Sequence, residues 1–196
     1  MPDAPTPPSA DPTADPARAL AAIVAEVGTA GAALVPEQLE AVAALLADAE
    51  RVFVHGAGRS GLALQMTAMR LMHLGLRVHV VGDATTPAIA SGDVLLTASG
   101  SGTTGIVRAA QNAVDAGARV AALTTAADSP LAGLASAVII VPAADKLDRS
   151  GSASAQYSGG LFEQLVVLTG DALFHALWKR GDASADELWP RHSNLA

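Results

Sequence analysis

The chain contains no cysteine, few aromatic residues and no cluster of basic residues. Without cysteine it can form neither a disulfide nor a thiolate nucleophile or metal ligand. Aromatic residues make up only 3% of its 196 residues, so a core must be built from the alanine, valine and leucine that dominate the 51% hydrophobic fraction. The net charge of −7 argues against nucleic acid as a partner, because binding to the phosphate backbone requires concentrated Lys and Arg.

The chain also lacks an apolar run long enough to cross a membrane. Residues 19–35 form an apolar run, but Glu26, Gly28 and Gly31 interrupt it. The run also falls short of the roughly 20 residues that a membrane span requires. The first 18 residues have neither a basic start nor an apolar stretch, so no secretory signal is predicted. We therefore expect a cytoplasmic protein without a membrane partner.

Short apolar runs alternate with helical patterns along most of the chain. Residues 1–16, rich in Pro, Ala and Asp, predict a disordered tail, and residues 17–196 predict one domain ending in a tail at 180–196. Runs that are apolar throughout are typical of a parallel sheet covered by helices on both faces. The expected fold is therefore α/β, with a five-stranded parallel sheet between two layers of helices. The expected strands are 52–55, 78–81, 94–98, 120–123 and 138–141, and the expected helices are 17–27, 36–49, 60–74, 104–116, 130–135 and 161–178.

The third expected strand is followed by a loop of alternating hydroxyls and glycines, Ser99-Gly100-Ser101-Gly102-Thr103-Thr104. Glycine lets the backbone approach a ligand, and the start of the next helix offers unpaired N–H groups and the positive end of its dipole. With the hydroxyls as further donors, the loop predicts a cradle for a phosphate group. No lysine lies in or directly after it, which excludes the Walker-type loop of nucleotide triphosphatases. An ordinary capped turn is the alternative, but it needs one Ser or Thr rather than four.

A second glycine loop, GAGRSG at 56–61, follows the first expected strand. It matches G-x-G-x-x-G, and Asp83 stands about where the ribose-binding acid of a dinucleotide site would lie. An NAD-binding domain is therefore an alternative, although the chain has room for only one domain. Arg59 and Ser60 are instead expected to face a small anionic ligand. Because ligands bind beyond the carboxyl ends of parallel strands, we expect both loops and residues 83–86 to converge on one site.

Six stretches of the chain carry a family resemblance: GAGRSG at 56–61, AMRLMHLG at 68–75, VVGDATTPAI at 80–89, SGSGTT at 99–104, GGLFEQ at 159–164 and RHSNLA at 191–196. Together they resemble the SIS (sugar isomerase) domain family, and within it the 6-phospho-3-hexuloisomerases of formaldehyde fixation. The resemblance implies a homotetramer without a cofactor. It also implies isomerisation of the sugar phosphate D-arabino-hex-3-ulose 6-phosphate to fructose 6-phosphate in the ribulose monophosphate pathway.

Three positions depart from the family pattern. Thr103 stands where similar enzymes have Glu, which removes a charge near the substrate. Residues 156–160 read QYSGG where the family has QPMGS, and Ala196 replaces a final Glu. These departures bear on the choice of sugar phosphate more than on the type of reaction.

The implied reaction moves a carbonyl from C3 to C2 through an enediol, and one carboxylate beside both carbons can transfer the proton. The LFEQ match assigns this base to Glu163, although a first-turn Glu could also simply complement the helix dipole. His192, in RHSNL, is expected to shuttle a proton between oxygens; simple surface exposure is the alternative. Ser60 and the Ser99–Thr104 loop are expected to bind phosphate, and Arg59 either to balance its charge or to hold the loop by a salt bridge.

The other histidines, His55, His73, His79 and His175, are expected to be packed in strands and helices. No pair of them has metal-ligand spacing, so no metal is predicted. The tail 180–196 has too little apolar content to fold alone. We expect Trp189 and Pro190 to anchor it on a neighbouring subunit, so that each site takes Glu163 from one chain and His192 from another.

Three rival functions follow from the same residues. The chain could be a different SIS isomerase, acting for example on arabinose 5-phosphate or sedoheptulose 7-phosphate. It could be a non-catalytic phosphosugar sensor, although no helix-turn-helix reader is visible in the sequence. It could also be the NAD-binding domain that the second glycine loop suggests.

Overall fold

A computed structural model describes residues 15–144, 148 and 154–195 of the chain. The elements are α1 (Pro16–Ala32), α2 (Pro36–Ala47), β1 (Val52–Gly56), α3 (Gly58–His73), β2 (Val78–Val80), β3 (Val94–Ala98), α4 (Thr104–Asp115), β4 (Arg119–Thr124), α5 (Pro130–Leu134), β5 (Ala137–Ile140), α6 (Gly160–Arg180), α7 (Ala185–Leu188) and the 3₁₀ turn η2 (Trp189–Arg191). All five expected strands and all six expected helices are present, with ends that differ by a few residues.

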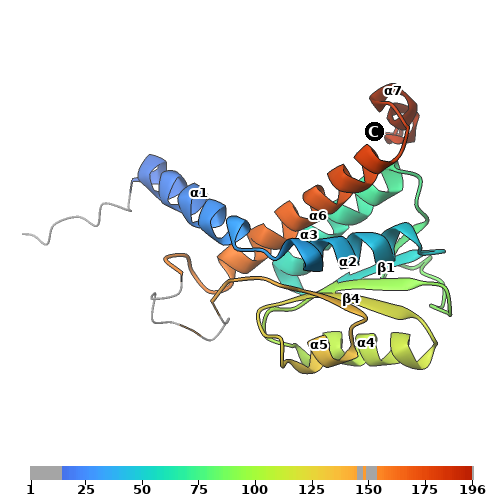
Figure 1. Ribbon diagram of the computed structural model, residues 1–196, viewed down its shortest axis with the longest axis horizontal. Coiled ribbons are helices and arrows are strands. Elements are labelled where there is room, and N and C mark those ends of the chain that lie inside the picture. The colour runs from blue at the N-terminus through green and yellow to red at the C-terminus, as the bar shows by residue number, and fades with distance from the viewer. Residues whose placement is uncertain (1–14, 145–147, 149–153, 196) are drawn as a thin grey trace, which may run out of the picture.

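The five strands form one parallel sheet in the order β2-β1-β3-β4-β5. Helices α4 and α5 cover one face, and α2, α3 and α6 cover the other, which gives three layers (Figure 1). Side chains alternate between the two faces: Val52 and Val54 pack under α2, α3 and α6, whereas Phe53 packs under α4 and α5. The α/β fold expected from the apolar runs is therefore confirmed.

Helix α1 is longer than expected, and it projects from the body of the molecule (Figure 1). The expectation ended this helix at Val27 because Gly28 and Gly31 follow, but Asp15 caps its first turn and the helix continues through both glycines to Ala32. Ala30 is buried, so packing outweighs the low helix propensity of glycine. Of the expected disordered tail 1–16, residues 1–14 lie outside the described residues, while Asp15 and Pro16 belong to the start of α1.

The C-terminal tail contains two short helical turns that the sequence reasoning did not predict. Ser184 and Glu187 form a capping box at the start of α7, in which each side chain accepts a hydrogen bond from the other's backbone N–H. Leu188 is buried and docks the turn. The expectation that His175 is packed is wrong, because it lies on the exposed side of α6.

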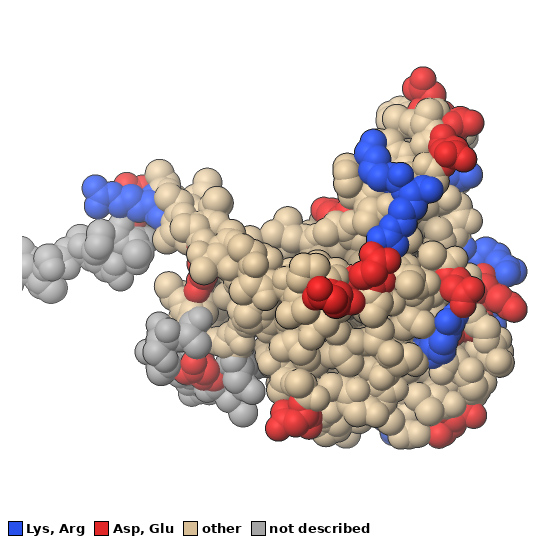
Figure 2. Space-filling model, viewed as in Figure 1, with Lys and Arg blue, Asp and Glu red and all other residues tan. Residues whose placement is uncertain are grey.

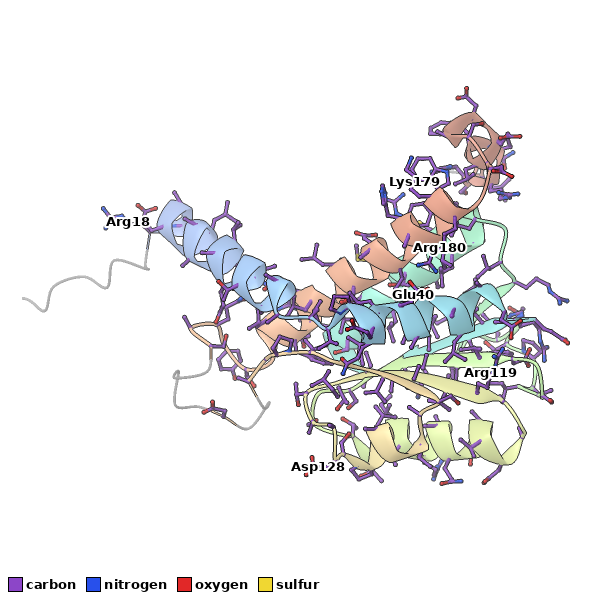
Figure 3. The ribbon with its side chains drawn as sticks, viewed as in Figure 1. Arg18, Glu40, Arg119, Asp128, Lys179 and Arg180 are labelled. Atoms are coloured by element: carbon purple, nitrogen blue, oxygen red, sulfur yellow. The ribbon has the colours of Figure 1, made fainter. Side chains whose placement is uncertain are left out.

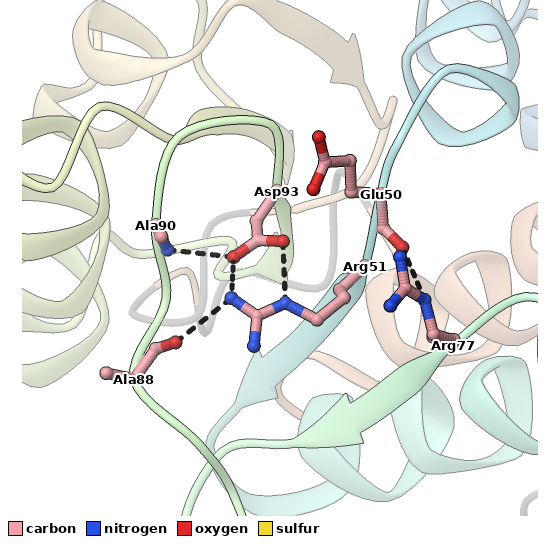
Figure 4. Close-up of polar contacts among 6 residues, drawn as sticks. All are labelled: Glu50, Arg51, Arg77, Ala88, Ala90 and Asp93. Atoms are coloured by element: carbon pink, nitrogen blue, oxygen red, sulfur yellow. Dashed lines mark hydrogen bonds and ion pairs between the residues drawn. The ribbon is translucent and has the colours of Figure 1, made fainter.

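An ion pair between Arg51 and Asp93 joins the starts of β1 and β3 (Figure 4). It lies at the amino ends of the strands, whereas the glycine loops lie at their carboxyl ends. Arg51 contacts Asp93 through two hydrogen bonds, Nε–Oδ1 at 2.9 Å and Nη2–Oδ2 at 2.5 Å. The carboxylate also accepts the Ala90 N–H at 2.8 Å, and Arg51 donates to the Ala88 carbonyl. Only 1% of the Asp93 side chain is exposed. The pair therefore holds the end of the connection between β2 and β3 against the start of β1.

Charged side chains of both signs are interspersed on the face shown in Figure 2, and Lys and Arg form no continuous basic patch there. Arg180 of α6 points toward Glu40 of α2 and pairs with it (Figure 3). Within the described residues no single helix is long and apolar enough to cross a membrane, although α1 and α2, which meet at an 81° bend, pass that test as a pair.

Candidate active site

A cavity of about 130 Å³ opens at the carboxyl ends of β1 and β3. Three helices begin at its wall, because Gly58 is the first residue of α3, Thr103 precedes α4 and Gly159 precedes α6. A helix start carries unpaired N–H groups and a partial positive charge, so three starts at one cavity favour an anion. The lining residues are Ala57, Gly58, Arg59, Ser60, Ala98, Ser99, Gly100, Ser101, Thr103, Ala144, Ser158, Gly159, Phe162 and Glu163.

The strand order explains why the cavity forms at this place. Strands β1 and β3 are neighbours in the sheet, and their following helices, α3 and α4, lie on opposite faces. The loops after the two strands therefore diverge and leave a crevice between them, which is the usual ligand site of an open parallel sheet. The two glycine loops converge as expected. The order 2-1-3-4-5 also differs from the 3-2-1-4-5-6 order of the dinucleotide-binding fold, so the G-x-G-x-x-G match does not indicate that fold here.

The glycines of the first loop allow the strand and helix backbones to touch. A Cβ atom on Gly61 would lie 2.4 Å from the Gly56 carbonyl oxygen, and a Cβ on Gly56 would lie 2.9 Å from the Gly61 backbone. Only glycine at both positions permits this contact. The start of α3 is thereby held directly against the end of β1, with Arg59 and Ser60 at the cavity.

Internal hydrogen bonds shape the second loop and leave several of its donors free. Ser99 is buried, and its Oγ accepts the Thr103 N–H at 3.0 Å. Thr125 Oγ1 donates to the Gly100 carbonyl at 2.7 Å. Within the described part of the chain, the N–H groups of Ser101, Gly102, Thr104 and Gly105 and the hydroxyls of Ser60, Ser101 and Thr104 have no hydrogen-bond partner. These groups can be satisfied by the oxygens of a bound anion.

Glu163 and Arg59 meet across the mouth of the cavity. Arg59 Nε lies 3.1 Å from Glu163 Oε2, and the exposed fractions of the two side chains are 67% and 21%. Glu163 stands in the first turn of α6, where its N–H donates to the Gly159 carbonyl at 3.1 Å. Gly159 adopts φ +81°, a conformation that turns the chain sharply into the helix and favours glycine. The turn places the carboxylate on the wall of the cavity.

Most of the predicted site residues line the cavity: Arg59, Ser60, Ser99, Gly100, Ser101, Thr103 and Glu163. Gly102 and Thr104 do not, because the bond from the Thr103 N–H to Ser99 draws Thr103 toward the wall and leaves Thr104 exposed as the first residue of α4. The segment 83–86 forms a turn of its own beyond β2 and also lies outside the lining. The expectation that this segment joins the site is wrong.

His192 lies far from the cavity of its own chain. Its ring stacks on His73 at the last turn of α3, and Arg191 Nη1 donates to the His73 carbonyl at 2.9 Å. His73 is 13 residues beyond Ser60 along α3, so about 20 Å of helix separates the site of His192 from Ser60 at the cavity. Burial, then the neighbouring His192 and Arg70, lowers the pKa of His73.

The sequence reasoning missed the apolar and small residues of the cavity wall. The Phe162 ring is buried and would contact a Cβ placed on Gly100 at 3.5 Å, so it supports the floor of the phosphate loop. Ser158 and Gly159 line the cavity as well. The LFEQ stretch, which contains both Phe162 and Glu163, is the sequence signal that indicates Phe162. Among the described residues no three His, Asp or Glu side chains gather in a way that could hold a metal ion.

Comparison with known proteins tests these features. The SIS domain model matches residues 45–162, a range that includes both glycine loops, β1 to β5 and the start of α6. The chain belongs to the SIS domain family. A 3-hexulose-6-phosphate isomerase of Mycobacterium gastri is 57% identical over 171 residues, which are 87% of this chain and 86% of that protein.

More distant members of the SIS family match over a similar length. A 3-hexulose-6-phosphate isomerase of Bacillus subtilis is 34% identical over 90% of this chain and 96% of its own. The crystal structure of a hypothetical protein from Methanococcus jannaschii, for which a molecular function of 3-hexulose-6-phosphate isomerase was inferred, superposes with a TM-score of 0.75. It is 26% identical, over 91% of this chain and 99% of that one. The family resemblance in the sequence is therefore confirmed.

Proposed function

We propose that the chain is a 3-hexulose-6-phosphate isomerase that converts D-arabino-hex-3-ulose 6-phosphate to fructose 6-phosphate. The observation that carries the proposal is the pairing of a carboxylate, Glu163, with an oxyanion loop, Ser99–Thr103, on the wall of one cavity. The 57% identity to the Mycobacterium gastri isomerase supports the choice of substrate. We place the reaction in the ribulose monophosphate pathway and the protein in the cytoplasm, both as predictions.

The geometry supports a simple mechanism. The 6-phosphate is held by the amides at the starts of α3 and α4 and by the hydroxyls of Ser60 and Ser101, which directs the sugar carbons toward Glu163. Glu163 removes the proton from C2, electrons move into the C2–C3 bond, and the C3 carbonyl oxygen takes a proton from His192 of a neighbouring chain, the shuttle that we propose, to give the 2,3-enediol. The 2-hydroxyl then returns a proton to that histidine as the C2 carbonyl forms, and Glu163 returns its proton to C3. A general base of this kind contributes roughly 10²–10⁴ in rate.

Arg59 has a defined place in this mechanism. In the empty cavity it neutralises Glu163, and its exposed side chain can turn toward the phosphate when the sugar binds. Glu163 Oε2 is then released for catalysis. This exchange of partners adds a full positive charge to the partial charges of the helix starts, in a chain whose net charge is −7. No cofactor or metal takes part in the proposed reaction.

We further propose that the protein assembles as a homotetramer of identical chains. Large apolar side chains lie exposed along α3, at Leu62, Met66, Met69 and Met72, and Leu168 of α6 is exposed as well. Exposed apolar surface of this kind favours burial against a partner. A second copy of the chain is the partner we propose, and light scattering of the purified protein measures its mass. A monomeric mass would contradict the assembly but not the reaction.

The test of function uses purified protein in EDTA with neither metal nor nucleotide added. Incubation with fructose 6-phosphate is expected to produce the 3-hexulose phosphate, detected by carbon NMR as a second ketose carbonyl. Thermal stabilisation by fructose 6-phosphate, arabinose 5-phosphate and NAD is measured in parallel. Stabilisation by arabinose 5-phosphate with no conversion of fructose 6-phosphate would favour another SIS isomerase. Stabilisation by NAD alone would overturn the proposal.

A further inference from the structure

A network of hydrogen bonds connects helix α1 to the segment that leads into α6. Glu26 of α1 accepts the Ala155 N–H at 3.0 Å through Oε1 and the Gln156 side-chain amide at 2.8 Å through Oε2. The Gln156 amide donates its second hydrogen to Gln164 Oε1 at 3.0 Å. The segment before α6 is thus bound on one side by a residue 130 positions earlier and on the other by the first turn of α6.

The network lies beside the catalytic cavity. Gln164 directly follows Glu163, and Ser158 and Gly159, which line the cavity, follow Gln156. A Cβ on Gly160 would come within 3.2 Å of Gln156 Oε1, so the amide packs tightly against the start of α6. A second hollow, of about 750 Å³, separates α1 from this segment and is lined by Glu26, Gln156, Arg59 and Glu163 among others. Arg59 and Glu163 therefore border both spaces, whereas Glu26 and Gln156 line only the second.

Glu26 can accept all of these hydrogen bonds because its carboxyl group is ionised. Burial alone would raise the pKa of its carboxyl, but hydrogen bonds from Gln156, Ser154 and the Ala155 amide outweigh burial and hold the pKa below its ordinary value. A carboxylate offers only acceptors, and the groups that face it here are donors. Hydrogen bonds to a charged acceptor are also stronger than those between neutral groups.

We propose that Glu26 is a positioning residue of the active site, which sets the place of Glu163 through Gln156 and Gln164. This inference rests on the proposed isomerase function. Helix α1 projects from the body (Figure 1), and besides its packing on α6 this network links it by hydrogen bonds to the segment that carries the catalytic wall. Glu26 does not line the cavity that the phosphate loop Ser99–Thr103 borders. The positioning of Glu163 can therefore be tested separately from the binding of phosphate.

The first test is Glu26→Gln. The amide keeps one acceptor but turns a second donor toward the Gln156 amide, so the segment before α6 loses a hydrogen bond. We expect kcat to fall about tenfold or more, since a small displacement of a catalytic group is costly, while the inhibition constant of inorganic phosphate changes less than about twofold. Glu40→Gln is the matched control, because Glu40 also binds another element, Arg180, but at the far end of α6 (Figure 3). It should keep full kcat.

Two further variants separate positioning from simple loss of stability. Glu26→Gln combined with Gln156→Glu places an acceptor opposite the new donor, and the Gln164 amide can turn over to donate to the new carboxylate, so this double variant should restore most of kcat. Glu26→Gln added to Glu163→Gln should lower kcat no further, because the effect of Glu26 passes through Glu163. A full multiplicative loss in that double variant would overturn the proposal.

Hydrogen exchange gives a readout that does not depend on activity. The peptide 154–164 should exchange faster in Glu26→Gln than in the wild type, and unchanged in Glu40→Gln. Unchanged exchange in Glu26→Gln, or unchanged kcat in an active enzyme, overturns the inference. If the wild-type protein lacks isomerase activity, the proposed function is refuted instead. Faster exchange in Glu26→Gln than in that wild type would then still show the structural link.

Discussion

His73 and His192 stack their imidazole rings with centroids 4.0 Å apart, at the end of α3 that lies away from the cavity. The Trp189 ring also contacts His192, with 4.7 Å between centroids, but is itself 69% exposed. The tail is therefore folded onto its own chain, and its outer surface remains open to a partner. A catalytic role for His192 requires that this end of α3 meets the cavity of another copy.

We predict that Glu163→Gln and His192→Ala complement each other when co-expressed. If each site takes Glu163 from one chain and His192 from another, random pairing leaves roughly a quarter of the sites with both residues intact. Activity of the purified mixture is the measurement. Co-expression of Glu163→Gln with a chain that carries both Glu163→Gln and His192→Ala is the control, since it provides no intact site. A His192→Ala enzyme with full activity would remove the histidine from the mechanism.

Glu163→Gln alone should lower kcat by roughly 10² or more and change KM by only a few-fold. The amide keeps the shape of the side chain and loses the base. Steady-state kinetics with fructose 6-phosphate measure both constants. Glu37→Gln is the matched control, because Glu37 is also a first-turn glutamate but belongs to α2. Near-normal turnover in a folded Glu163→Gln protein would place the base elsewhere.

Replacing Ser101 and Thr104 together by alanine should weaken binding rather than turnover. The Ser101 hydroxyl on the cavity wall holds the phosphate in the ground state and the transition state alike, and the single variants test whether Thr104 contributes. Each lost bond to a charged group is worth about 1.5–3 kcal/mol, so the inhibition constant of inorganic phosphate should rise tenfold or more. Thr85→Ala, in an exposed turn outside the cavity, is the control. If Ser101 alone carries the effect, Thr104 does not touch the anion, as its place outside the lining suggests.

Asp93→Asn should destabilise the fold by about 1.5–3 kcal/mol at neutral pH, because it removes the charge from the buried acceptor of the hydrogen bonds from the partly exposed Arg51. Burial would raise the Asp93 pKa, but hydrogen bonds from Arg51 and the Ala90 N–H lower it below its ordinary value of 3.8. Stability from a depressed carboxyl pKa is present above that ordinary value and is lost as pH falls toward the folded-state pKa. Urea unfolding should therefore show the gap between wild type and variant narrowing below about pH 4. A gap that stays constant with pH would contradict this assignment.

How far the sequence predicts this molecule depends on the range of the interactions. The strands were predictable because neighbouring residues such as Leu95 and Leu96, whose side chains point to opposite faces of the sheet, are both apolar. The two loops were predictable because their glycines lie close together in the sequence. The Glu26–Gln156 contact was not predictable, since the two residues are 130 positions apart and no spacing rule connects them. The capping box of Ser184 and Glu187 was visible in the sequence, as Ser-x-x-Glu, and was overlooked.

The three helix starts around the cavity have a consequence for how substrate arrives. Their partial charges act only at contact distance, whereas the net charge of −7 repels an anionic sugar phosphate from farther away. Dissolved ions screen that distant repulsion, because the screening (Debye) length is about 10 Å at 0.1 M salt. They screen the short-range attraction between a bound phosphate and the amides much less. Encounter with substrate should thus become faster as ionic strength rises from a low value. Proteins that gather anions with a basic surface behave in the opposite way.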